Sequence, residues 1–307
     1  MSTRNAENSR KQSVKRKTEQ WVWGYLFIAP LLIGLIVFYI FPFIQSFFYS
    51  FTDINTFNQA KFVGLENYKK MLQDPLLWGA ALNTLKYVVI TVPISMVLSL
   101  IVAALLNTGI RGKSIYRTLY FLPTVTMAAA IAMVWKWIFN GSYGILNQLL
   151  AFFGIAGKNW LSEPDTAFYM VMVVGIWGTV GYNMIILLAG MQGISRSYYE
   201  AASIDGARSF TQFFKITLPM LTPTIFFVLI TGIIGAFQVF DSIYMMIGKG
   251  SLAYESTQTL VMLFYRNAFD YSYKGYACAI AMFIFLIIMA VTVIQMKLQK
   301  TWVNYED

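Results

Sequence analysis

The sequence predicts an all-α integral membrane protein with six transmembrane helices. Of its 307 residues, 58% are hydrophobic and only 12% are charged, which is too apolar for a soluble globular domain. Six uninterrupted apolar segments each reach the roughly 20 residues that a helix needs to cross a bilayer. Lys and Arg are spread unevenly between these segments, and this asymmetry predicts how the chain is oriented.

The six predicted spans are residues 25–48, 87–106, 119–139, 168–191, 224–247 and 276–296. The first span starts near the N-terminus, where a signal peptide would also lie. It is too long for a signal peptide, lacks a small-residue cleavage site, and contains Pro42 within a run of aromatic residues. We therefore count it as a true span.

The distribution of basic residues places both termini in the cytoplasm. With this orientation, the cytoplasmic segments carry twice as many Lys and Arg residues as the outer loops. Residues 1–20 form a predicted disordered basic tail, 21–300 the transmembrane domain and 301–307 a short cytoplasmic tail. The net charge of +9 then reflects topology and attraction to anionic lipid in the bilayer. The basic residues are too dispersed to indicate a nucleic-acid partner.

The residue inventory argues against an enzyme. The chain has no His and one cysteine, Cys278, so His-dependent acid–base catalysis, His-ligated zinc and a disulfide are excluded. Gly112-Lys113-Ser114 is not a phosphate-binding loop, because Asn107 stands where that motif requires glycine. We expect no metal site and no cofactor bound by this chain, and a membrane-embedded enzyme is a remote alternative.

Residues 192–223 form a polar island between two apolar runs. Ser195 or Ser197 can cap a helix that continues through Glu200, with this acid in the first turn, where the helix dipole favours it. Gly206 is expected to end that helix, since glycine adopts left-handed backbone angles freely. A second short amphipathic helix should follow, with its apolar positions at Phe210, Phe213, Phe214 and Leu218. Physical reasoning alone gives only a helical connecting loop.

A motif gives this loop a sharper interpretation. Glu-Ala-Ala is followed, after three intervening residues, by a glycine, and Ile-x-Leu-Pro begins about ten residues further on. The matching residues are Tyr199, Glu200, Ala201, Ala202, Asp205, Gly206, Ala207, Ile216, Leu218 and Pro219. The pattern resembles the EAA loop of binding-protein-dependent ABC importer permeases. By this resemblance, 192–223 is the coupling loop, and its helical projection is the coupling helix that docks into a groove on a separate cytoplasmic ATPase.

Two further motifs narrow the resemblance to maltose-type carbohydrate permeases. Residues 62–68 read FVGLENY and resemble the FxGLxNY element of that group, while residues 237–241 resemble its FxxFD element. The resemblance implies type I ABC importer architecture in a bacterial or archaeal cytoplasmic membrane. It also implies a second homologous permease, an extracytoplasmic sugar-binding protein and an ATPase dimer that uses ATP and Mg²⁺. A heterodimer of permeases is expected, although one sequence leaves a homodimer open.

Candidate sugar contacts lie on the fourth and fifth spans. Sugars are bound by aromatic faces and by hydroxyl or amide groups. The candidates are Trp177, Thr179, Tyr182 and Asn183 on span four and Phe237, Gln238, Asp241 and Tyr244 on span five. Glycines three residues apart on span four equally indicate close helix packing. On span five, the spacing lets Gln238, Asp241 and Tyr244 share one helix face.

The alternative function is an ion-coupled secondary transporter of a small polar solute. Such a carrier would show several ionisable residues within its spans, whereas Asp241 is the only carboxylate in any predicted span. The sequence leaves the sugar open, from monosaccharides to oligosaccharides and glycerol-3-phosphate-like substrates. A strongly anionic substrate is disfavoured because no basic residue lies well inside a span, and Lys136 is interpreted as an interfacial anchor.

Overall fold

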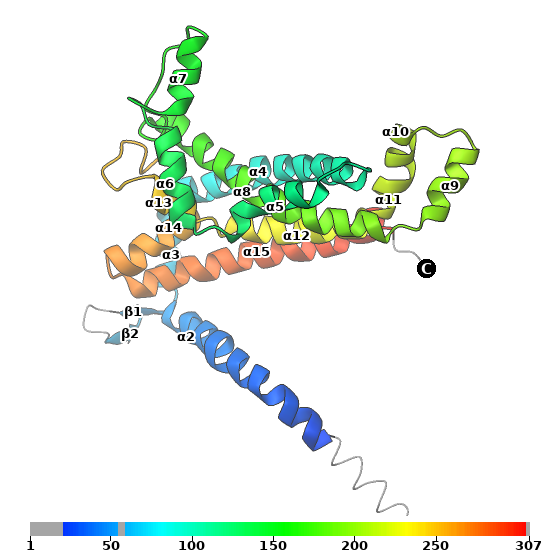
Figure 1. The fold of residues 1–307 in the computed structure, drawn as a ribbon. Coiled ribbons are helices and arrows are strands. Elements are labelled where there is room, and N and C mark those ends of the chain that lie inside the picture. The colour runs from blue at the N-terminus through cyan, green and yellow to red at the C-terminus, as the bar shows by residue number, and fades with distance from the viewer. Residues whose placement is uncertain (1–20, 55–58, 305–307) are drawn as a thin grey trace, which may run out of the picture.

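A computed structural model describes residues 21–54 and 59–304. Its body consists of the long helices α4 (Pro75–Asn107), α8 (Pro164–Gly193) and α15 (Lys274–Trp302), together with α12 (Thr222–Phe237) (Figure 1). The remaining elements are η1 (Ile36–Ile40), α2 (Phe41–Tyr49), β1 (Thr52–Ile54), β2 (Ala60–Phe62), α3 (Glu66–Gln73), α5 (Lys113–Val125), α6 (Ala128–Ile138), α7 (Ile145–Phe152), α9 (Arg196–Ile204), α10 (Ser209–Gln212), η2 (Phe213–Thr217), α11 (Leu218–Met220), α13 (Asp241–Met246), α14 (Leu260–Tyr265) and η3 (Arg266–Asp270). The predicted disordered tail (1–20) lies outside the described residues.

Not every predicted span is a continuous helix. The described part of the chain has four helices long and apolar enough to cross a membrane, or six if each of two bent pairs counts as one span. These pairs are α5 with α6, and the segment Ser209–Met220 with α12. Helices α5 and α6 meet at 101°, so the third predicted span (119–139) was wrong as one straight helix. In the fifth (224–247), α12 ends at Phe237 and α13 starts at Asp241. Apolar composition identified these segments, but it carries no information on where the backbone breaks.

The all-α prediction also missed a short antiparallel hairpin of β1 and β2, with Thr52 opposite Phe62. This hairpin explains the FVGLENY segment. The Asn67 amide donates to the carbonyls of Ser50 and Thr52, at 2.9 Å each, and Gly64 has a φ of +59°, an angle that glycine adopts without steric cost. The segment thus fastens the end of α2 to the start of the body.

The N-terminal helix, Trp21–Tyr49, leads away from the body (Figure 1). None of its most apolar window is buried within this chain. Its π-helical turn, η1, ends just before Pro42, whose missing N–H and ring clash disturb the preceding turn of a helix. Contact with the body comes from its C-terminal part, where the rings of Phe43 and Phe285 lie 5.0 Å apart.

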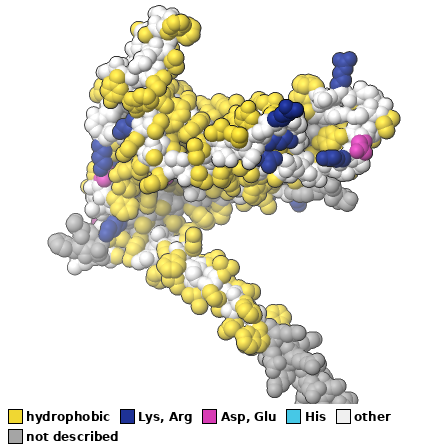
Figure 2. Space-filling model, in the orientation of Figure 1, with side chains coloured by type: hydrophobic (Ala, Val, Ile, Leu, Met, Phe, Trp, Pro, Cys, Tyr) yellow, Lys and Arg dark blue, Asp and Glu magenta, His cyan; other side chains and the backbone are white. Residues whose placement is uncertain are grey.

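The body has two distinct ends. Helices α9 and α10 project from one end, whereas α7, α3 and the hairpin lie at the other (Figure 1). Hydrophobic side chains cover most of the visible surface between the ends (Figure 2). Inside, buried residues of α4 and α8, including Met184 and Leu187, pack together with α12. Such an apolar surface is what a bilayer requires of a spanning protein.

Candidate functional site

Three neighbouring cavities lie in the body, and α8 lines two of them. The first, about 210 Å³, lies between α4, α8 and α12 and is lined by the predicted residues Thr179, Tyr182 and Asn183. Asn183 is only 7% exposed, and no described residue hydrogen-bonds its side-chain amide. A buried amide normally finds a partner, so this one is available to a ligand or to water.

The second cavity lies where both interrupted helices break. It measures about 290 Å³, and Thr126 and Ser242 contribute to its wall from the α5–α6 and α12–α13 breaks. It shares Gly175 and Thr179 with the first cavity. Irregular backbone at membrane depth is tolerated where it is buried in protein or lines a water-filled space. The breaks therefore have a physical reason to face this cavity.

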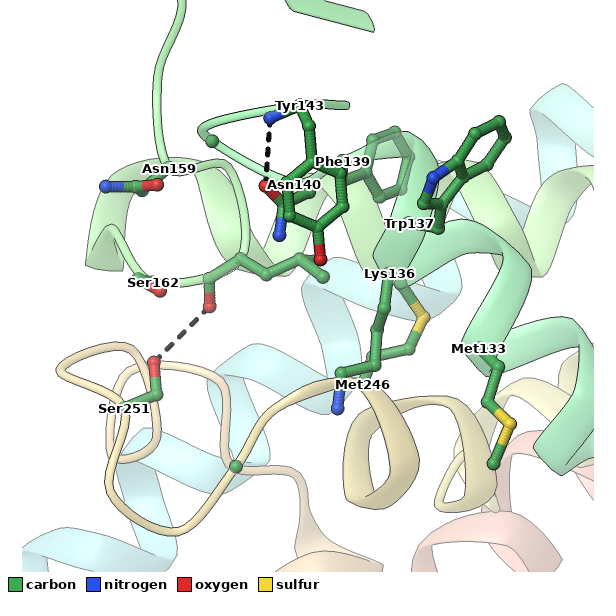
Figure 3. Close-up of a pocket in the computed structure, with 13 residues that line it drawn as sticks. Met133, Lys136, Trp137, Phe139, Asn140, Tyr143, Asn159, Ser162, Met246 and Ser251 are labelled. Carbon is green, nitrogen blue, oxygen red and sulfur yellow. Dashed lines mark hydrogen bonds between the residues drawn. The ribbon is translucent and has the colours of Figure 1, made fainter. Parts of the chain in front are cut away.

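The third cavity opens beside α6 and the loop that follows α13, with a volume of about 490 Å³ (Figure 3). It shares Met246 with the second cavity. Lys136, Asn140 and Ser251 give it a polar wall. The three cavities thus neighbour one another from Asn183 to Lys136, each sharing at least one lining residue with the next.

The three glycines in the middle of α8, Gly175, Gly178 and Gly181, differ in what surrounds them. A side chain at Gly181 would overlap the Tyr120 backbone, and one at Gly175 would overlap the Tyr87 hydroxyl. No neighbouring atom lies within 4 Å of the position that a Gly178 side chain would take, and this residue lines the second cavity. Close packing therefore accounts for two of the glycines, while the third leaves the wall of the cavity open.

Other predicted contacts lie elsewhere. Trp177 lines another, largely apolar cavity of about 690 Å³, which shares Pro123 with the second cavity. It does not face the first cavity with Thr179, because residues 177 and 179 lie about 200° apart around a helix. Phe237 is 5% exposed within the core, whereas Gln238 and Asp241 are exposed. The prediction that Gln238, Asp241 and Tyr244 share one helix face was wrong, since the helix stops between the first two. Tyr244 instead joins an aromatic cluster, stacking on Phe240 at 5.1 Å.

Sequence reasoning missed the polar stripe on α4. Tyr87, Thr91 and Ser95 line the first cavity, opposite Thr231 of α12. The signal was present in the sequence, because polar residues four apart in an apolar helix share one face. The Thr91 hydroxyl donates to the Tyr87 carbonyl at 2.7 Å, which lets it sit in an apolar helix at little cost.

Capping interactions from nearby residues set both ends of the projecting helix α9. The Ser195 side chain accepts from the Ser197 backbone N–H at its N-terminus, as predicted. Glu200 lies beyond the first turn, so its predicted place near the positive end of the dipole was wrong. At the other end, Gly206 has a φ of +79° and Ala207 N–H donates to the Ala202 carbonyl at 2.8 Å. This is a Schellman motif, which satisfies the last carbonyls of the helix.

The projection is a self-contained module. The Tyr199 hydroxyl lies 2.9 Å from the Thr217 hydroxyl, which connects α9 to the helical segment Ser209–Met220, called the return helix below. Gln212 donates to Ser203 at 2.9 Å. Glu200 and Ala201 are exposed. Beside them, Ile204 and Phe210, which were not predicted as contacts, are 87% and 77% exposed. The module therefore presents apolar side chains next to an acid on an otherwise polar projection.

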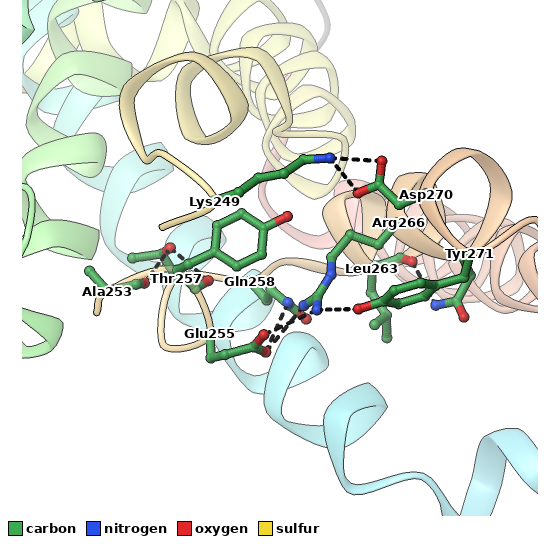
Figure 4. Close-up of polar contacts among 11 residues, drawn as sticks. Lys249, Ala253, Glu255, Thr257, Gln258, Leu263, Arg266, Asp270 and Tyr271 are labelled. Carbon is green, nitrogen blue, oxygen red and sulfur yellow. Dashed lines mark hydrogen bonds and ion pairs between the residues drawn. The ribbon is translucent and has the colours of Figure 1, made fainter. Parts of the chain in front are cut away.

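A polar network braces the opposite end (Figure 4). Arg266 is 8% exposed and donates to both oxygens of Glu255, at 3.0 and 3.1 Å, and to the Tyr271 hydroxyl at 2.8 Å. Lys249 pairs with Asp270 at 2.9 Å, and this hydrogen bond raises the pKa of the lysine ammonium. Within the described ranges, no three His, Cys, Asp or Glu side chains gather in a way that could hold a metal ion.

Comparison with known proteins connects these features to a family. Residues 77–303 match the model of the binding-protein-dependent transport system inner membrane component. The chain belongs to this family. It is 39% identical to the probable ABC transporter permease protein YesP of Bacillus subtilis, over 92% of each chain. It is 33% identical to the trehalose/maltose transport system permease protein MalF of Thermococcus litoralis, over 93% of this chain and 96% of that one.

A solved structure supports the fold. A chain of the bacterial alginate ABC transporter, crystallised in complex with an alginate-bound periplasmic protein, superposes with a TM-score of 0.84. The match covers 95% of this chain and 99% of that chain at 20% identity. These comparisons confirm the resemblance to carbohydrate ABC importer permeases and a multi-pass membrane protein.

Proposed function

We propose that this chain is a pore-forming permease subunit of an ATP-driven, binding-protein-dependent sugar importer. The observation that carries the proposal is the projection at α9, which holds the Glu-Ala-Ala motif on a capped helix outside the apolar body. Relatives across the whole length of the chain are named as permeases for trehalose and maltose, lactose and arabinooligosaccharides. The substrate class of this chain is inferred from those names.

In the proposed topology, the body crosses the membrane six times, with the bent pair α5–α6 counted as one crossing and α12, extended by the α13 segment, as another. The projection and both termini face the cytoplasm, as the distribution of Lys and Arg predicts. The membrane is a bacterial or archaeal cytoplasmic membrane. Helix α7 and the polar network around Arg266 then face outward.

The three cavities mark the proposed sugar path. Aromatic, hydroxyl and amide groups from α4 and α8 line its inner part, and these are the groups that bind sugar faces and rims. Within this path, the predicted contacts with the best support are Thr179, Tyr182 and Asn183. Trp177 lies in the apolar cavity beside this path, and Phe237, Gln238, Asp241 and Tyr244 line none of the three cavities. These residues would contact sugar only in another conformation or beside a partner.

Coupling follows from how the projection joins α12. A separate ATPase binds Glu200, Ala201, Ala202 and the apolar side chains beside them. The Tyr199–Thr217 hydrogen bond makes α9 and the return helix move together. The return helix meets α12 at a 65° bend next to Pro219, and the far part of α12 borders the first cavity. Movement of the ATPase can therefore reach the sugar path.

The proposed assembly contains other chains for ATP hydrolysis, for sugar delivery and for the second half of the pore. An ATPase dimer binds ATP and Mg²⁺, an extracytoplasmic binding protein delivers sugar, and a second homologous permease completes the pore. A heterodimer is expected from the maltose-type resemblance.

The test is a mild-detergent pull-down of the full-length protein from its native membrane, with every copurifying chain identified. A Walker-motif ATPase and a second permease are expected. The matched control is Glu200→Arg, which should lose the ATPase and retain the permease. If the wild-type protein purifies without an ATPase under all conditions, and uptake depends on a proton gradient instead of ATP, the ion-coupled alternative holds.

A further inference from the structure

The outermost cavity contains a lysine without a carboxylate partner. Lys136 extends from the last turn of α6 into this cavity, and its Nζ lies 3.5 Å from the Met245 carbonyl (Figure 3). No described Asp or Glu forms an ion pair with it, whereas Lys158 and Lys249 at the same end pair with Glu163 and Asp270. The cavity lining holds no acidic residue.

The bend between α5 and α6 explains the direction of this side chain. Because the two helices meet at 101°, α6 packs against α13 and aims Lys136 toward the carbonyl end of α13. An interfacial anchor would instead extend along the apolar surface toward lipid headgroups. The geometry therefore favours a group that faces a ligand over the anchor expected from the sequence.

The walls around Lys136 have the chemistry of a sugar site. Trp137 and Tyr143 are 50% and 58% exposed and offer aromatic faces. The Asn140 side-chain oxygen accepts from two backbone N–H groups, of Ser142 and Tyr143, which leaves its NH₂ group to donate elsewhere. The Ser162 hydroxyl has no hydrogen-bond partner in the described part of the chain. A volume of about 490 Å³ is within the range of small-ligand sites.

We propose that this cavity binds an anionic carbohydrate. Lys136 contacts the carboxylate, sulfonate or phosphate of the ligand, and the sugar ring lies against Trp137 or Tyr143. The inference rests on the proposed function and names a substrate class within it. The sequence argument against an anionic substrate considered only basic residues deep within a span, and Lys136 lies at the outer end of the path. The two inner cavities have no charged lining residue, so the negative charge is recognised at the entrance.

The test uses the full-length protein in lipid nanodiscs, with its lysines ¹³C-dimethylated and the Lys136 NMR signal assigned by its loss in Lys136→Gln. D-Galacturonate and D-glucose 6-phosphate are titrated as acidic sugars, with D-galactose and sodium acetate as controls. We expect a saturable shift of the Lys136 signal with at least one acidic sugar, and an affinity at least about tenfold weaker for galactose and acetate, a difference of about 1.4 kcal/mol. The Lys158 signal serves as the internal control and should not show this preference.

Absence of a saturable shift with both acidic sugars would overturn the inference, and so would an equal response to acetate, which marks simple pairing of an accessible lysine. Both of these results can be told apart from failure of the proposed function. If only the inference about Lys136 fails, the ATPase still copurifies with the wild-type protein. If the proposed function fails, the ATPase does not copurify.

Discussion

The two ends of the body are held together in different ways. At the end of the Arg266 network, hydrogen bonds join distant parts of the chain. Asn83 donates to the carbonyls of Ser256 and Gln258, 173 and 175 residues away, and Tyr276 donates to Asp74 across 202 residues. In the projection, the side-chain hydrogen bonds of α9 to α11 stay within 18 residues. We call the end around Arg266 the frame, because its hydrogen bonds join distant parts of the chain. The projection of α9 to α11 is a module with local contacts, and it meets α12 at the 65° bend.

The difference suggests a division of labour. A frame bonded across distant elements resists local opening, whereas a module with local contacts can move as a unit. Changes in the projection should therefore alter transport and leave stability nearly intact, while changes in the frame should do the reverse. The following predictions test this contrast.

The largest effect is expected from Glu200→Arg. The side chain is exposed, so the free energy of unfolding should change by less than about 0.5 kcal/mol. ATP-dependent sugar uptake should fall by more than about tenfold, because reversing a charge at an interface opposes docking of the partner. Uptake in membrane vesicles and thermal unfolding in detergent measure both quantities. Normal uptake at normal membrane levels would remove Glu200 from the coupling role.

Arg266→Ala should have the largest effect on stability. It removes hydrogen bonds to Glu255 and Tyr271 and packing against the Tyr254 ring, at a cost of about 2 kcal/mol, as expected for hydrogen bonds to charged groups. Lys249→Ala is the matched control, because that pair is largely exposed and should change stability little. Equal unfolding temperatures for the two variants would show that the frame does not depend on Arg266.

Gly206 gives a smaller effect that reports on backbone geometry alone. Its surroundings leave room for a side chain, but its φ of +79° costs a leucine about 1 kcal/mol. Gly206→Leu should therefore weaken ATPase binding by several-fold, whereas Gly206→Asn should stay near wild type, since Asn tolerates this conformation. The ATPase recovered in a pull-down provides the measurement. Equal recovery for Leu and Asn would mean that the Schellman turn does not position α9.

The smallest effect is expected from Tyr199→Phe. It deletes only the hydroxyl that meets Thr217, a loss of about 1 kcal/mol. Coupling should loosen, so that more ATP is hydrolysed per sugar transported while ATPase binding is unchanged. An unchanged ratio of ATP to sugar in proteoliposomes of the whole assembly would show that α9 and the return helix move together without this bond.

Sequence reasoning predicted the apolar segments and the projection because both follow from local rules. Hydrophobic runs identify helices, and Ser195 and Gly206 mark the ends of α9. The breaks at Thr126 and between Gln238 and Phe240 were missed, since apolar composition does not show where the backbone of a span is interrupted. The grouping of Trp177 with Asn183 followed proximity along the chain, whereas the helix turns them toward different cavities. The stripe from Tyr87 to Ser95 could have been found from its spacing.

The central claim is that α9 docks on an ATPase at the cytoplasmic end. The most direct measurement is photo-crosslinking in native membranes from a benzophenone amino acid placed at Ile204 or, as control, at Phe152 on α7. Both residues are highly exposed, at 87% and 85%. Ile204 is on α9 and Phe152 on α7, and these helices lie at opposite ends of the body (Figure 1). We predict a Walker-motif ATPase adduct from position 204 and none from position 152. An ATPase adduct from position 152, or none from position 204, would contradict the claim.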